Sequence, residues 1–179
     1  MRTVKTFVLF GRTYRTKQLP AAVALAETKE EGTSISPVEV LRQAEAAVLV
    51  KDQWVTLDNG EAINEHVSDP CGGINAHAVL DALLDQLQEL NFGFLSGRKE
   101  ISIPARFRSP VEAPAAGSLP PVLATLVANG LATLKDLQTV YSAEDAMEVF
   151  DAFSADQLAK ALAHEAAAKE AEQKAKAKR

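Results

Sequence analysis

Three histidines and one cysteine are the side chains of this chain best suited to bind a metal or to attack a substrate. They are His66, His77, His164 and Cys71. The histidine spacings match no zinc-binding pattern, and a single cysteine cannot complete a structural zinc site. A catalytic cysteine needs a base and an orienting group, and only His77 is near Cys71 in the sequence. We therefore expect no metal site, and a structural role for the cysteine.

Three carboxylates, Asp81, Asp85 and Glu89, follow one another at intervals of one helical turn. Paired carboxylates act as acid and base when burial separates their pKa values. These three lie opposite a row of leucines, so we expect solvated side chains. The glycines before and after this row form neither a phosphate-binding loop nor a dinucleotide-binding fingerprint. The sequence thus predicts a protein with no catalytic residues and no cofactor, which is not an enzyme.

The acidic row belongs to a predicted helix that begins after Asp69-Pro70 and ends near Asn91. Apolar residues recur in it every three or four positions, at Ile74, Val79, Leu80, Leu83, Leu84, Leu87 and Leu90. A helix of about twenty residues is roughly 30 Å long and can form one wall of the core. Phe92, Phe94 and Leu95 then group three large apolar side chains around a glycine.

A small antiparallel sheet is predicted beside this helix. Residues 4–10 and 12–17 flank Gly11 as a β-hairpin, with Phe7 and Leu9 on one face and Val8 and Phe10 on the other. A hairpin alone is marginally stable. We expect residues 101–104 to supply a third strand, at an edge because of the proline at position 104.

The remaining patterns are mostly helical. Helices are predicted at residues 21–27, 37–50 and 61–67, with a short strand at 54–57 and a turn at Asn59-Gly60. Further helices are predicted at 122–128, 133–141, 142–153 and from 155 to about 178. The last of them has no large apolar residue after Leu162, so we expect it to become ordered against a partner.

These elements predict an α+β fold that is mainly α-helical, with a small N-terminal antiparallel sheet packed on helices and a helical C-terminal unit. Residues 1–108 would form the core domain and residues 109–118, rich in proline and small residues, a linker. Residues 119–153 would form a small three-helix unit, and residues 154–179 a charged, alanine-rich helical tail.

Composition favours a soluble cytoplasmic protein, with 47% hydrophobic and 24% charged residues and no apolar stretch long enough to span a membrane. The net charge of −5 is unevenly distributed. Residues 1–17 contain five basic and no acidic residues, whereas residues 18–159 contain 8 basic and 21 acidic ones. The acidic central region would repel nucleic acid, and the basic ends could attract anions or this protein's own acidic surface. The same charge distribution is also explained if the charged residues lie on solvent-exposed faces that bind no partner.

The helices on either side of Asn129-Gly130 have about the lengths of a helix-turn-helix motif. A recognition helix normally presents basic or amide side chains to the bases. This one offers only Lys135 and Gln138, beside Asp136. We therefore expect no nucleic-acid binding. A DNA-binding regulator that uses this C-terminal helical unit is the alternative function.

The end of the leucine helix carries a resemblance to a known family. Its sequence is NFGFLSG at residues 91–97, with an Asp-Pro turn before the acidic helix and the segment ISIPARF after it. The opening KTFVLFGRTYRTKQL and the later YSAEDAMEVFDAF fit the same pattern. Together these segments resemble the tail assembly chaperones of long-tailed bacteriophages. The resemblance implies a protein that binds the tape measure protein in the host cytoplasm and keeps it soluble until tail tube assembly.

The resemblance also implies partners, but no active-site residues. The tape measure protein is the expected client, and the tail tube protein, a longer frameshifted form of this chain and a second copy are further candidates. Our hypothesis for the client contacts is a set of six apolar residues: Leu83, Leu87, Leu90, Phe92, Phe94 and Leu95. The same residues could instead be core. A small phage effector that binds a host protein is another alternative function.

Overall fold

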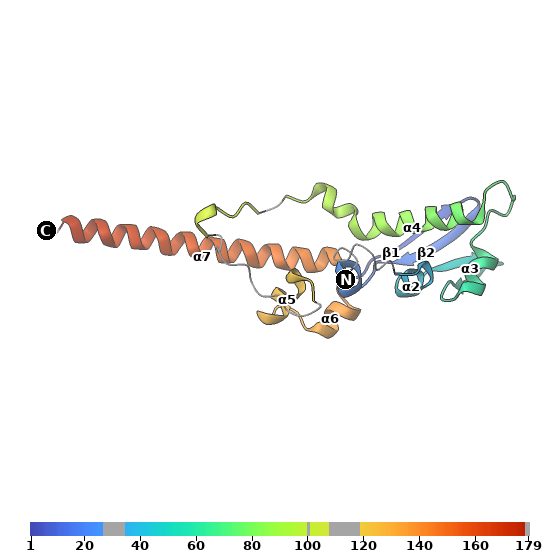
Figure 1. The fold of residues 1–179 in the computed structure, drawn as a ribbon, viewed down its shortest axis with the longest axis horizontal. Coiled ribbons are helices and arrows are strands. Elements are labelled where there is room, and N and C mark those ends of the chain that lie inside the picture. The colour runs from blue at the N-terminus through green and yellow to red at the C-terminus, as the bar shows by residue number, and fades with distance from the viewer. Residues whose placement is uncertain (27–34, 100, 108–118, 178–179) are drawn as a thin grey trace.

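A computed structural model describes residues 1–26, 35–99, 101–107 and 119–177 (Figure 1). The fold is α+β and mainly helical, as predicted. The strands are β1 (Val4–Leu9), β2 (Arg12–Lys17), β3 (Ala47–Val50) and β4 (Gln53–Thr56). The helices are α1 (Ala21–Ala26), α2 (Pro37–Gln43), α3 (Gly60–His66), α4 (Ala76–Phe92), α5 (Pro121–Ala128), α6 (Leu134–Thr139) and α7 (Ala143–Ala177). Short 3-10 turns occupy Gly93–Gly97 and Ala105–Phe107.

The predicted hairpin forms one side of an antiparallel sheet with the strand order β1-β2-β3-β4. Phe10 and Gly11 connect β1 to β2, and both have positive φ angles, of 47° and 78°. A two-residue loop of this kind matches the right-handed twist of the strands. The predicted faces of β1 are confirmed, because Phe7 and Leu9 pack against the core whereas Val8 and Phe10 are exposed.

The third strand differs from our prediction. It is β3, which pairs with both β2 and β4, and residues 101–104 form no strand. The predicted helix over residues 37–50 ends at Gln43, and the chain turns at Glu45, which has a φ of 49°. The expected turn at Asn59-Gly60 is also wrong, because the Asn59 side chain caps α3 by accepting a hydrogen bond from the Ala62 N–H at 2.9 Å.

Helix α4 lies across the inner face of the sheet and is seventeen residues long (Figure 1). Ile74, which we placed in this helix, precedes it. The main core joins α4 to the sheet and to α2 and α3. Its largest buried members are Tyr14, Leu41, Val48, Leu57, Val67, Val79, Leu83 and Leu87.

A second core lies between α5, α6 and the first turns of α7, and is built on Leu123, Leu126, Leu137 and Ala146. Ala21 of α1 also belongs to it, so the N-terminal part of the chain packs directly on the C-terminal helices. The predicted break between helices 142–153 and 155–178 is wrong, because α7 continues without interruption from residue 143 to residue 177. No proline or glycine occurs in this stretch to end the helix.

The predicted linker, residues 109–118, lies entirely outside the described part of the chain. Within the described residues, no helix is long and apolar enough to cross a membrane.

Candidate protein-binding surface

The structure divides the six predicted client contacts into three groups. Leu83 and Leu87 are core residues under the sheet. This corrects our hypothesis that they contact a partner, because their side chains are buried in the chain's own main core. Leu90 is partly buried on the same helix.

The apolar cluster at the end of α4 has side chains both in the core and on the surface. Phe92 and Phe94 are partly buried and pack against the main core, whereas Leu95 is 45% exposed. Beside it is a hollow of about 190 Å³ that lies between this turn and α7. The hollow is lined by Phe94, Gly97, Arg98, Glu144, Met147, Glu148 and Asp151. Apolar and charged side chains thus meet at the junction of α4 and α7.

Asn91 is a residue that our sequence reasoning missed. It occupies the position one turn after Leu87 on the leucine face and is buried. Its Oδ1 accepts a hydrogen bond from the Leu19 N–H at 2.7 Å, and its Nδ2 donates to the Leu87 carbonyl oxygen at 2.7 Å. A buried amide at a leucine position is a signal for such a connection, because a buried polar group needs partners. Asn91 fixes the chain after β2 to the end of α4.

The described residues 98, 99 and 101–107 run along α7, and two ion pairs hold this segment to the helix (Figure 1). The Arg98 guanidinium donates to both carboxylate oxygens of Asp151, at 2.8 and 2.5 Å. Further along, the Arg106 guanidinium donates to Glu165 at 2.9 Å. Between these ion pairs α7 has a partly buried row of residues: Ser154, Leu158 and Ala161. This part of α7 lies between the helix residues that bind Arg98 and Arg106.

Beyond Glu165, α7 projects from the rest of the molecule (Figure 1). Residues 166–176 are exposed, and their ion pairs lie along the helix itself, from Lys169 to Glu165 and from Lys174 to Glu170. Leu162, just before this stretch, is also exposed. The projecting part of α7 is therefore a free helical surface of alanine and mixed charge.

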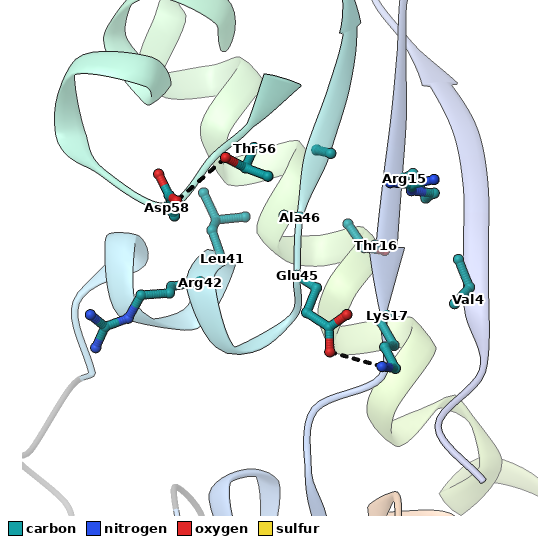
Figure 2. A pocket seen from close by; sticks show the side chains of 11 residues that line it. Val4, Arg15, Thr16, Lys17, Leu41, Arg42, Glu45, Ala46, Thr56 and Asp58 are labelled. Carbon is teal, nitrogen blue, oxygen red and sulfur yellow. Dashed lines mark hydrogen bonds and ion pairs between the residues drawn. The ribbon is translucent and has the colours of Figure 1, made fainter. Parts of the chain in front are cut away.

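A second hollow, of about 470 Å³, lies beside the sheet (Figure 2). Its lining comes from the hairpin, from α2 and from the strands β3 and β4. Glu45 is at its centre and accepts hydrogen bonds from Lys17 at 2.8 Å and from Arg2 at 3.2 Å. Thr16 also lines this hollow, and its buried Oγ1 has no hydrogen-bond partner among the residues that the structure describes.

Glu45 gives this second hollow a pH-dependent contact. The hydrogen bond from Lys17 holds the pKa of the Glu45 carboxyl below its ordinary value, against the opposing effect of partial burial, and the charge of Arg2 lowers this pKa further. A carboxylate with a lowered pKa stabilises the fold above its ordinary pKa, and this contribution is lost as the pH falls through the folded-state pKa.

We therefore expect Glu45→Gln to be less stable than the natural chain at pH 7, with a difference that shrinks as the pH falls below about 4. Urea unfolding at several pH values between about 3 and 7 measures it. The difference is small, because the Glu45 side chain is more than half exposed to solvent. A constant difference over the whole pH range would contradict the role assigned to the Lys17 contact.

The cysteine and the carboxylates that we considered for catalysis or metal binding lie in a turn and on an exposed helix face. The Asp69 carboxylate accepts hydrogen bonds from the N–H groups of Cys71, Gly73 and Ile74, and so shapes the turn before α4. Cys71 is exposed. The three carboxylates of α4 are also exposed, as predicted. In the described ranges, no three His, Cys, Asp or Glu side chains are grouped to hold a metal ion.

The helix considered for DNA recognition is short. It is α6, with six residues, and it exposes Lys135 and Gln138. Asp136 is committed to the start of the helix, where it forms a capping box with Thr133.

Comparisons with protein-family models, with curated proteins and with solved structures give no match for this chain.

Proposed function

We propose that this chain is a non-enzymatic binding protein that acts as a phage tail assembly chaperone. It would bind the tape measure protein in the host cytoplasm and keep it soluble until the tail tube assembles. The projecting part of α7, residues 166–177, carries the proposal, because this helix extends about 18 Å at 1.5 Å per residue beyond the last contact with the body of the protein. The family resemblance at residues 91–97 supports it.

The composition of this helix suits a reversible contact with another helix. Short alanine side chains allow two helix backbones to approach closely, and flanking lysine and glutamate side chains keep the free surface hydrated. The projecting part continues a helix whose first turns are packed in the second core, and packing against a client would add stabilisation to its free end. The buried apolar area is small, which favours release when tail tube subunits compete for the client.

The nearby exposed residues extend this surface toward the body. Leu162 precedes the projecting part of α7, and Leu95 lies at the junction of α4 and α7. The proposed client surface therefore consists of Leu95, Leu162 and residues 166–177. The buried leucines of α4 do not belong to it.

Removal of the projecting helix tests the proposal. The chain would be expressed with the tape measure protein of the same phage, once in full length and once ending at Glu165. We expect the shortened chain to keep its melting temperature, because residues 166–176 are exposed and their ion pairs lie within α7. The soluble fraction of the client and the amount recovered by pull-down should both fall several-fold.

A matched control separates helix loss from charge loss. Glu170→Gln with Lys174→Gln removes the 3.8 Å ion pair but keeps the helix, so it should retain most of the client. A client that stays equally soluble with the chain ending at Glu165 would contradict the assigned surface. A client that is insoluble even with the full chain would contradict the chaperone function itself. A salt-dependent shift of duplex DNA would then support the DNA-binding alternative.

A further inference from the structure

Strand β1 lies at one edge of the sheet, and its main chain is free on that side. The closing pair of a two-residue hairpin, here Leu9 and Arg12, exchanges hydrogen bonds, and such pairs recur at every second residue. The pattern continues to the hairpin's open end, where the Gln18 N–H donates to the Thr3 carbonyl oxygen at 2.9 Å. The intervening residues of β1 therefore direct their N–H and C=O groups away from β2. These residues are Val4, Thr6 and Val8.

The three outward-directed residues are accessible. Val4 is 53% and Val8 65% exposed, and Thr6 between them is exposed as well. In the part of the chain that the structure describes, their main-chain groups have no hydrogen-bond partner outside the sheet. The edge thus offers three donors and three acceptors beside a row of β-branched side chains.

Soluble proteins usually protect such an edge with proline, a bulge, an inward-pointing charge or a very short strand. The opposite edge, β4, has four residues and is shorter. Strand β1 has six residues, an uninterrupted register with β2 and no proline, and its one protective feature is the charge of Lys5 on the inner face. The geometry is that of a sheet that accepts one more strand from a binding partner.

Charge favours a partner other than a second copy. The hairpin carries only basic charges, and Lys5 lies on the inner face of the edge strand. Its ammonium contacts the Gln86 side-chain oxygen at 3.4 Å and lies over the Phe7 ring. Neither group is a carboxylate. If two copies paired β1 with β1 through these same three residues, the two Lys5 side chains would be diagonal neighbours on one face, where like charges repel.

We propose that β1 binds an extended acidic segment of a partner protein by adding it to the sheet as a fifth strand. The segment places an acidic side chain beside Lys5 on the inner face and β-branched side chains beside Val4 and Val8 on the outer face. This inference does not depend on the tail assembly function, because it involves neither α7 nor the tape measure protein.

The probe for this site is a fluorescent, end-blocked peptide that alternates valine with glutamate, and fluorescence anisotropy measures its binding. Thr6→Pro removes the central outward N–H without removing a hydrogen bond between β1 and β2, and proline is tolerated at such edge positions. We expect this variant to bind the peptide about ten-fold more weakly. Thr6→Val keeps the N–H group and is the matched control, with expected affinity close to that of the natural chain.

Two further measurements address charge and backbone separately. A peptide with lysine in place of glutamate, and the Lys5→Glu variant with the original peptide, should each bind about ten-fold more weakly. A peptide that is N-methylated along its hydrogen-bonding edge should not bind, and this result holds even if Thr6→Pro reduces the stability of the fold. Peptide binding should also slow hydrogen exchange at the amides of Thr6 and Val8.

Three results would overturn the proposal. The first is equal peptide affinity of Thr6→Pro and Thr6→Val when both are folded by circular dichroism. The second is an absence of binding at peptide concentrations up to about 1 mM, which corresponds to a binding free energy weaker than about −4 kcal/mol. The third is a dimer in analytical ultracentrifugation that Thr6→Pro dissociates, because the edge would then belong to a second copy.

Discussion

Replacement of Leu83 by alanine should lower the free energy of unfolding by about 3 kcal/mol. Leu83 is fully buried in the middle of α4, where it meets the residues of the sheet that face inward. The substitution removes the transfer free energy of the lost carbon atoms and leaves a cavity that the surrounding rigid elements fill only in part. Urea unfolding followed by circular dichroism measures the effect as a lower midpoint with an unchanged slope.

Leu95→Ala is the matched control for this prediction, because it makes the same chemical change twelve positions later in the chain, at an exposed site. We expect it to change the free energy of unfolding by less than about 0.5 kcal/mol. Similar losses for the two variants would contradict the division of the apolar residues into core and surface. The pair of variants thus distinguishes packing from partner contact among residues of one chemical type.

Asn91→Leu should cost about 2 kcal/mol of stability, although leucine has a similar size and is the residue that the helix pattern favours at this position. The buried Leu19 N–H loses its acceptor, the Asn91 Oδ1, at a contact between the segment before α1 and the end of α4 where both residues are shielded from solvent. Removing one partner of a buried hydrogen bond costs the desolvation of the group left behind. Thermal and urea unfolding measure the loss.

Asn129 provides a matched control for Asn91, because its Nδ2 also donates to the carbonyl oxygen four residues earlier, that of Thr125, at 2.9 Å. Asn129 is exposed, so water can solvate whatever its replacement leaves unpaired. We expect Asn129→Leu to change the stability by less than about 0.5 kcal/mol. If Asn91→Leu were as stable as the natural chain, the Leu19 contact would contribute nothing to the fold.

Several elements could be predicted because their signals are local. The hairpin needs a two-residue loop with positive φ angles, and Phe10-Gly11 places a glycine at one of the two positions. Helix α4 needs apolar residues at intervals of three and four, and its leucines provide them. Helix α2 begins where Ser36 accepts a hydrogen bond from the Glu39 N–H, a contact between residues only three positions apart.

The secondary structure of residues 44–50 could not be predicted from local sequence signals. Their alanines and valines are compatible with both a buried strand and a helix, and periodicity cannot separate the two in so short a run. The strand forms because β2 and β4 provide hydrogen-bond partners on both of its sides. Residues 101–104 have the alternation of a strand, but the sheet does not reach them. The two arginines that flank them bind α7 instead.

The candidate binding surface could be predicted in part for the same reason. The pattern of α4 identified its apolar face, but the coverage of each leucine depends on where the hairpin lies on the helix. Leu83 and Leu95 are the same residue type, and only contacts between distant parts of the chain bury one and expose the other. The free edge of β1 depends likewise on which strand ends the sheet.

Residue type and short-range spacing are sufficient to specify the α+β composition, the hairpin, the leucine helix and the alanine-rich end of α7, because each depends on interactions within a few residues. The partner of β3, the continuity of α7 with the second core and the division between core and accessible apolar residues are properties of the folded chain. They depend on hydrogen bonds and packing between segments far apart in the sequence, and these form only when the complete core assembles.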